Sequence, residues 1–114
     1  VLVRRASEAD LSVVTSEGGR VLPDGTPLRW TLAALEGHPF GGLVPFFIDW
    51  GDSRHPGDGL SAACSLLGVR VEHPEPERVE AWLRAVGLDT PVSRAHAPRI
   101  VASLDTPRGI VELS

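Results

Sequence analysis

The sequence predicts an α+β fold: a β-hairpin followed by a strand, a helix and three more strands, with the strands in a mixed, curved sheet. Three patterns lead to this prediction. Residues 28–34 alternate between the two faces of a half-buried strand, and the aromatic run 44–50 is typical of a second strand. Residues 76–86 carry an apolar stripe at helical spacing, and residues 99–104 and 109–113 alternate again.

The hairpin is expected to pair its two strands across the loop 36–42. Pro23-Asp24-Gly25 precedes it as a turn, because proline presets one dihedral angle and glycine accepts the next. In the second strand the side chains alternate between two faces. Phe46, Ile48 and Trp50 share one face, and Phe47 and Asp49 share the other.

Residues 1–20 leave two interpretations open. Ser7 and Asp10 fit the start of a short helix that carries Leu11 and Val14 and ends at Gly18-Gly19. The run 11–14 fits a strand equally well.

The helix over 76–86 is the element that the sequence defines best. Its apolar stripe consists of Val79, Trp82, Leu83 and Val86. Pro76 suits the first turn, and Gly87 is placed to end the helix. A strand over 64–73 is expected before it, because residues 69–72 alternate and include β-branched side chains.

Two regions around this helix are less regular. Residues 60–67 are ambiguous, since their apolar side chains also fit a helical spacing. After the helix we expect a short or irregular strand near 91–94, and then a final hairpin across the turn 105–109. The order from residue 64 onward is therefore βαβββ.

Composition limits the class of protein. A chain of 114 residues forms one domain, and its net charge of −4 argues against a nucleic-acid or membrane-surface partner. Cys64 is the only cysteine, so no intrachain disulfide can form, and we expect it to be a small buried side chain. No stretch is apolar enough to cross a bilayer and no signal peptide is visible, so we expect a cytoplasmic protein.

We expect one domain over residues 1–114, in three parts. Residues 1–20 are poorly defined, residues 21–59 form the hairpin and loop of a partial first module, and residues 60–114 form the βαβββ module. The chain starts at Val1 and contains no methionine, which indicates a processed start, a valine-type start codon or a fragment.

Residues 43–56, LVPFFIDWGDSRHP, are the most informative segment. Together with PDGTPLRW at 23–30, HPEPERVEAWLRAVGL at 73–88 and LDTPRGIVEL at 104–113, the segment resembles the bacterial glyoxalase-like members of the vicinal oxygen chelate superfamily (glyoxalase, bleomycin resistance and dioxygenase proteins). The resemblance covers most of residues 20–114. It implies a cupped sheet that binds a small molecule.

In that superfamily the metal ligands come from the first and last strands of each module. The resemblance places the last-strand carboxylate at Glu112 and the first-strand histidine near Leu67, and leucine cannot ligate a metal. A site with three or more ligands cannot be assembled from these positions, and His73 is not taken as a replacement. We therefore predict no metal cofactor, with a divalent metal completed across a homodimer as the alternative.

The candidate ligand-binding residues are aromatic: Trp30, Phe46, Phe47 and Trp50. Alternating aromatic side chains in strands are also typical of a core, so both interpretations stay open.

The candidate catalytic residues are Asp49, His55 and Glu112. Asp49 lies within an apolar strand, so it is either functional or paired with an arginine such as Arg29 across the hairpin. His55 follows the end of that strand, although a His-Pro corner is more often a turn whose ring bonds locally. Glu112 is either a solvated edge residue or a carboxylate that lines the cup.

We weigh two alternative functions of different classes and prefer the first. The first is binding of a small, partly aromatic molecule in the cupped sheet without a metal, by a chain that forms a homodimer. The second is a lyase- or isomerase-type enzyme that uses Asp49, His55 or Glu112 for proton transfer. Fold alone does not choose between them.

Overall fold

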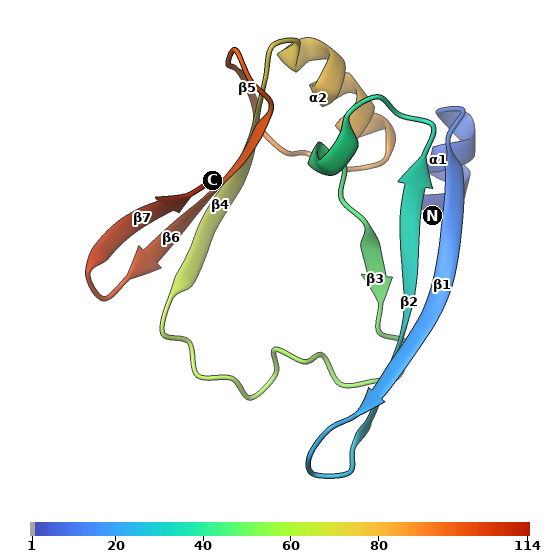
Figure 1. Cartoon of the computed structure of the whole chain (residues 1–114), viewed down its shortest axis with the longest axis vertical. Helices are drawn as coiled ribbons and strands as arrows, with labels where there is room; N and C mark the ends of the chain where they lie inside the picture. The colour runs from blue at the N-terminus through green and yellow to red at the C-terminus, as the bar shows by residue number, and fades with distance from the viewer. Residues whose placement is uncertain (1) are drawn as a thin grey trace.

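The structure, a computed structural model, describes residues 2–114 (Figure 1). Val1, on which the question of the chain start depends, lies outside the described residues. The described residues contain two α-helices, one short 3-10 helix and seven strands. In chain order these are α1 (Leu2–Glu8), β1 (Ser12–Val21), β2 (Pro27–Glu36), η1 (Gly41–Leu43), β3 (Phe47–Asp49), β4 (Ser65–His73), α2 (Pro76–Ala85), β5 (Val92–Arg94), β6 (Arg99–Thr106) and β7 (Gly109–Leu113).

The first sheet is antiparallel and has the order β1-β2-β3. Its first turn forms as the Pro-Asp-Gly sequence predicts, because the Asp24 carboxylate accepts the Thr26 N–H at 2.9 Å and Gly25 takes a φ of 86°. The predicted pairing across the 36–42 loop is confirmed, since Leu32 opposes Ile48.

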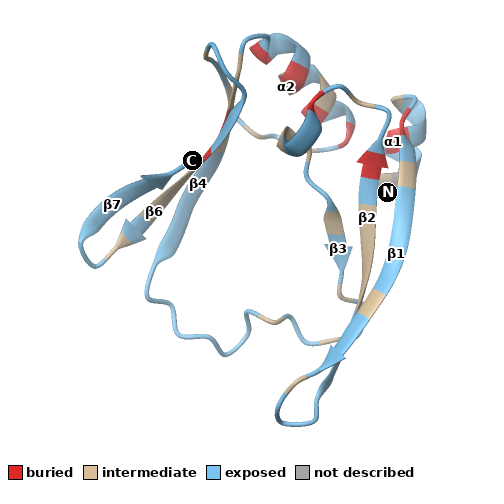
Figure 2. Ribbon diagram, viewed as in Figure 1, coloured by how far each residue is buried: buried red, intermediate tan, exposed pale blue. Residues whose placement is uncertain are grey.

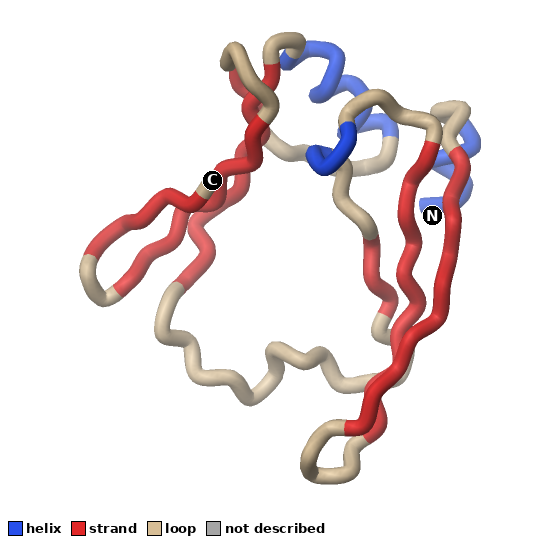
Figure 3. The backbone as a smooth tube through the Cα atoms, viewed as in Figure 1, coloured by secondary structure: helices blue, strands red, loops and turns tan. Residues whose placement is uncertain are grey.

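The second sheet has the order β5-β4-β6-β7 and is mixed. β4 and β5 are parallel and are connected through α2, whereas β6 is antiparallel to both β4 and β7. This arrangement confirms the predicted βαβββ order and the α+β fold. In Figure 1 the two sheets lie on opposite sides of the molecule, and the segment from β3 to β4 runs between them as a long loop that is drawn without helix or strand in Figure 3.

In the N-terminal region the structure contradicts the helix that we considered over residues 7–19. The helix ends at Glu8, before the expected helical residues Leu11 and Val14, and β1 then runs through Gly18 and Gly19. The strand interpretation is therefore confirmed and extended. The strand forms because β1 pairs with β2 along ten residues. A short isolated helix would lack this stabilising contact with a neighbouring element.

Two other boundaries differ from the sequence. β3 covers only Phe47–Asp49, because Pro45 has no N–H to donate to a sheet. β4 begins at Ser65, so within the ambiguous stretch residues 60–64 are loop and residues 65–67 are strand. Cys64 is exposed, which overturns the expectation that it is buried.

The core lies where α1 and α2 meet the ends of the two sheets, as the buried positions in Figure 2 show. One cluster joins Ala6 and Leu11 to Leu35 and Val86, and the other consists of Phe40, Val71, Val79 and Leu83. The predicted stripe of α2 therefore packs inward, with Trp82 partly buried between the clusters. None of the described helices has the length and apolar character needed to cross a membrane.

The helices define two kinds of sheet face, which we call helix-side and helix-free. Leu35 on β2 and Phe47 on β3 pack against the cluster that contains α1, so they mark the helix-side face of the first sheet. Val71 on β4 packs against α2 and marks the helix-side face of the second sheet. Because side chains alternate along a strand, these marker residues assign each remaining strand residue to one of the two faces.

Candidate functional site

Trp30, Trp50 and His55 form an aromatic cluster at the end of the first sheet. The ring centroids of Trp30 and Trp50 are 5.6 Å apart with an edge-to-face geometry, and those of Trp50 and His55 are 5.7 Å apart. Trp30 lies on the helix-free face, because it alternates with Thr31 and Leu35 of the helix-side face. The three rings therefore stand on the face that no helix covers.

The Trp30 indole lies over a strand glycine. Its register partner on β1 is Gly18, and a Cβ built on Gly18 would lie 2.5 Å from the indole Nε1 and 2.6 Å from Cε2. Glycine thus leaves the space that the indole occupies. The tryptophan remains partly exposed and lines an open depression together with Trp50, Ser53 and Arg54.

Two hydrogen bonds hold the segment that carries Trp50 and His55. The Asp49 carboxylate accepts the Gly51 N–H at 2.8 Å, which forms the turn directly after β3. The Ser53 hydroxyl accepts the Arg29 N–H at 2.9 Å, so the loop continues along β2 beyond the last residue of β3. These two hydrogen bonds hold the loop so that the Trp50 ring contacts the Trp30 ring.

Strand alternation directs the Asp49 side chain to the face opposite Trp30, although Asp49 also lines the depression beside Trp50. Its register partner is Thr31, and it alternates with Phe47 on the helix-side face. The ion pair with Arg29, one of the two alternatives for Asp49, does not form among the described residues, and the carboxylate bonds locally instead. Asp49 is exposed.

The other two aromatic candidates do not join the cluster. Phe47 packs against the core cluster of Leu35 and Val86, which is the structural role that the sequence left open. Phe46 is 61% exposed and makes no ring contact with Trp30 or Trp50 in the described residues.

Each of the three His-Pro corners has the same local bond. His38, His55 and His73 each accept, at Nδ1, the backbone N–H two residues later, at 3.3, 3.0 and 2.9 Å. The intervening proline has no N–H, so this donor is the first one available to the ring. In a neutral ring of this kind the proton is on Nε2, which makes the exposed His55 a potential hydrogen-bond donor to a ligand.

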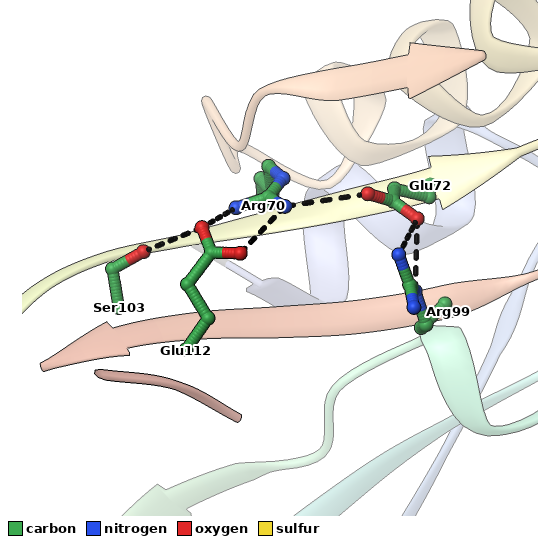
Figure 4. Close-up of polar contacts among 5 residues, drawn as sticks. All are labelled: Arg70, Glu72, Arg99, Ser103 and Glu112. Atoms are coloured by element: carbon green, nitrogen blue, oxygen red, sulfur yellow. Dashed lines mark hydrogen bonds and ion pairs between the residues drawn. The ribbon is translucent and has the colours of Figure 1, made fainter. Parts of the chain in front are cut away.

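Glu112 lies in a separate polar network on the helix-free face of the second sheet (Figure 4). Arg70 Nη1 donates to Glu112 Oε1 at 2.6 Å, and Arg70 Nη2 donates to Oε2 at 3.3 Å. Ser103, the register partner of Glu112, donates to Oε1 at 3.4 Å. The hydrogen bond from Arg70 lowers the pKa of Glu112, and the same bond raises the pKa of Arg70.

The network continues along β4 and β6. Arg70 also contacts Glu72, whose carboxylate accepts Arg99 Nε at 2.9 Å. Sequence analysis missed Arg70, Glu72 and Arg99. The available signal was the alternation of charged residues with the β-branched Val69 and Val71, which indicated a polar face on this strand.

A family model described as a glyoxalase-like domain matches residues 2–87. The chain belongs to this family. The match includes the Trp30 and Trp50 segments and agrees with the resemblance to the vicinal oxygen chelate superfamily, whereas Glu112 lies beyond the matched residues. No curated protein and no solved structure matches the chain.

The described residues of the glyoxalase-like domain do not bring a set of metal ligands together. Among residues 2–114, no three His, Cys, Asp or Glu side chains lie close enough together to hold a metal ion. Glu112, the carboxylate that the resemblance assigns to metal binding, is occupied by the Arg70 guanidinium. Asp49 is on the first sheet and Glu112 on the second, and neither belongs to a group of three potential ligands among the described residues, so they do not fit a shared metal site in a single copy.

Proposed function

We propose that this glyoxalase-like domain binds a small, partly aromatic molecule on the helix-free face of its first sheet, without a metal. The edge-to-face cluster of Trp30, Trp50 and His55 carries this proposal. Aromatic side chains that stay partly exposed and are fixed by turns offer both ring faces and edges to a planar ligand.

The surroundings of the cluster support this class of ligand. Beside the tryptophans the same face presents Leu32 and Ile48, which is 40% exposed. Polar groups lie around the tryptophans: the His55 ring contacts Trp50, and the depression is also lined by Ser53 and by the charged residues Glu17, Arg20, Arg29, Asp49, Asp52 and Arg54. Aromatic side chains next to polar and charged groups suit a small ligand that is partly aromatic and carries polar substituents.

The second candidate is a lyase- or isomerase-type reaction in which His55 and a carboxylate transfer a proton. His55 lies in the loop that directly follows Asp49, the last residue of β3, which favours this pair over His55 and Glu112. Among the described residues no hydrogen bond or ion pair joins the Asp49 carboxylate to the His55 ring, so a second subunit, with or without a divalent metal, would have to complete the site.

Ligand-observed saturation-transfer NMR tests the binding proposal, with indole and 2-naphthol as probes. We expect saturation transfer to both probes, a loss of most of it in the Trp30→Ala and Trp50→Ala variants, and no change on addition of EDTA. Leu60→Ala is the control, because Leu60 is an exposed apolar side chain that does not line the depression.

Two results would oppose the proposal. Equal saturation transfer in the wild type and in both tryptophan variants would place binding elsewhere. Binding that EDTA abolishes and zinc, nickel, manganese or iron(II) restores would instead support the metal-dependent enzyme.

A further inference from the structure

The chain exposes more surface than a self-contained protein of its size. Its accessible surface is 8005 Å², whereas a compact monomer of 12.2 kDa exposes about 6100 Å². The radius of gyration is 16.7 Å, compared with about 13 Å for a compact chain of this length. The excess exceeds the roughly 800 Å² that each partner buries in a standard protein interface.

Much of the exposed apolar surface lies on the helix-side face of the second sheet. The strand register places apolar residues there in three rows: Leu66, Leu104 and Val111; Val69, Ala102 and Leu113; and Val71 with Ile100. The β-bulge between Leu66 and Gly68 shifts the alternation by one residue, which brings Leu66 onto the same face as Val69. We call these eight residues the apolar lattice.

α2 covers only one corner of the apolar lattice. Val71 is 3% exposed because it packs against Val79 and Leu83 of the helix. At the uncovered end, Leu66 is 63%, Leu113 54% and Val111 41% exposed. An apolar area of this kind on a soluble protein indicates a surface that another molecule covers.

The opposite face of the same strands is mostly charged, although it also carries Val101 and Ile110. Arg70, Glu72, Arg99 and Glu112 form the ion-paired network there. The sheet is therefore amphipathic: its charged side chains are paired with one another, and beyond the corner under α2 its apolar face has no partner among the described residues. The apolar lattice is also separate from the Trp30 and Trp50 cluster, which lies on the first sheet.

We propose that the apolar lattice is the interface at which two copies of this chain pack face to face about a twofold axis. A twofold contact brings the same patch together from both copies, so it requires a self-complementary surface. The lattice contains no charged side chain that would specify a partner of opposite charge. Two such faces stack about 10 Å apart, as in a β-sandwich.

The dimer forms on the helix-side face and leaves the helix-free faces open. The inference is thus independent of the proposed ligand site, because the chain can dimerise whether or not it binds a ligand. It also differs from a dimer in which strands of two copies jointly complete the cup.

Sedimentation velocity of the full chain, with substitutions on β7, tests this interface. We expect the wild type to be dimeric at about 100 µM. Val111→Glu buries a charge in each copy of the apolar lattice, so we expect it to raise the dimer dissociation constant at least about 100-fold. Ile110→Glu is the matched control, because Ile110 is adjacent on β7, 71% exposed and on the charged face, and it should leave the dimer intact.

Cross-linking keeps the test valid if Val111→Glu fails to fold. In a Cys64→Ser background, Val111→Cys should give covalent dimers with a bismaleimide that spans about 10 Å, and Ile110→Cys should not. A monomeric wild type at about 100 µM would overturn the proposal. Equal dissociation by both glutamate variants, or equal cross-linking at both cysteines, would also overturn it.

Discussion

The Trp30 indole occupies the volume that a side chain on Gly18 would fill. The two residues oppose each other in the β1–β2 register, and a Cβ on Gly18 would lie within 2.8 Å of Nε1, Cε2 and Cζ2. Such distances are not compatible with the present position of the ring. The glycine therefore fixes the height of Trp30 above the sheet and, through Trp30, the contact with Trp50.

Gly18→Ala is consequently expected to displace the Trp30 ring and to destabilise the hairpin. Overpacking of this kind typically costs about 1–3 kcal/mol. Urea unfolding measures the loss of stability, and tryptophan fluorescence reports the displaced indole. Gly68→Ala is the control, because Gly68 is also a strand glycine but a Cβ there meets nothing within 4 Å. Equal effects of the two substitutions would contradict the role of the Trp30 contact.

The Glu112–Arg70 pair predicts a specific dependence of stability on pH. The pKa of Glu112 is lowered in the folded chain, chiefly by the hydrogen bond from Arg70, so the unfolded chain binds the proton more readily. The stabilisation is present above the ordinary glutamate pKa and is lost as the pH falls through the lowered pKa of the folded state. We expect Glu112→Gln to make the free energy of unfolding fall less steeply in acid.

Urea unfolding between neutral and acidic pH measures this effect. Glu36→Gln serves as the control, since Glu36 forms no ion pair within the part of the chain that the structure describes. If the curves of the wild type and of Glu112→Gln ran parallel at all pH values, the Arg70 contact would not contribute.

The His-Pro corners predict unequal effects from the same substitution. His38 bonds the N–H of Phe40, a residue that is 8% exposed, whereas His55 bonds the N–H of the exposed Gly57. An unpaired donor in a buried position costs about 1–3 kcal/mol, while water replaces the lost bond at the surface. His38→Ala should therefore destabilise the chain much more than His55→Ala.

Thermal unfolding of the two variants compares these costs. His38→Asn should recover part of the loss, because an asparagine carboxamide can also accept the N–H two residues later. Failure of asparagine to recover any stability would assign the effect to ring packing against Trp82 instead.

Trp82 allows the energetic cost of an unpaired, buried N–H donor to be tested. Its Nε1–H has no hydrogen-bond partner among the described residues, although its ring packs against His38 and Phe40. Trp82→Phe keeps an aromatic ring and removes the unpaired donor, so the gain offsets part of the lost packing. We expect a change in stability of less than about 1.5 kcal/mol by urea unfolding. A larger loss would indicate that a partner binds the indole N–H in solution.

The sequence predicted those helices and strands in which the apolar residues recur at one regular spacing, because that spacing places them on one buried face. α2 was defined by Val79, Leu83 and Val86, which are all buried, and the last hairpin was defined by its alternation and turn. The N-terminal region was open to two interpretations, because its few apolar residues fit either period. Pairing with β2 then decided in favour of a long strand.

The candidate site shows the same division. The sequence by itself determined the aromatic residues, the His-Pro corners and the faces of each strand, because these follow from residue type and from backbone alternation. Only the tertiary structure decided that Trp50 meets Trp30, that Phe47 joins the core and that Arg70 holds Glu112. These contacts join residues far apart in the chain, and their register depends on turns, a bulge and helix packing, which local sequence patterns do not specify.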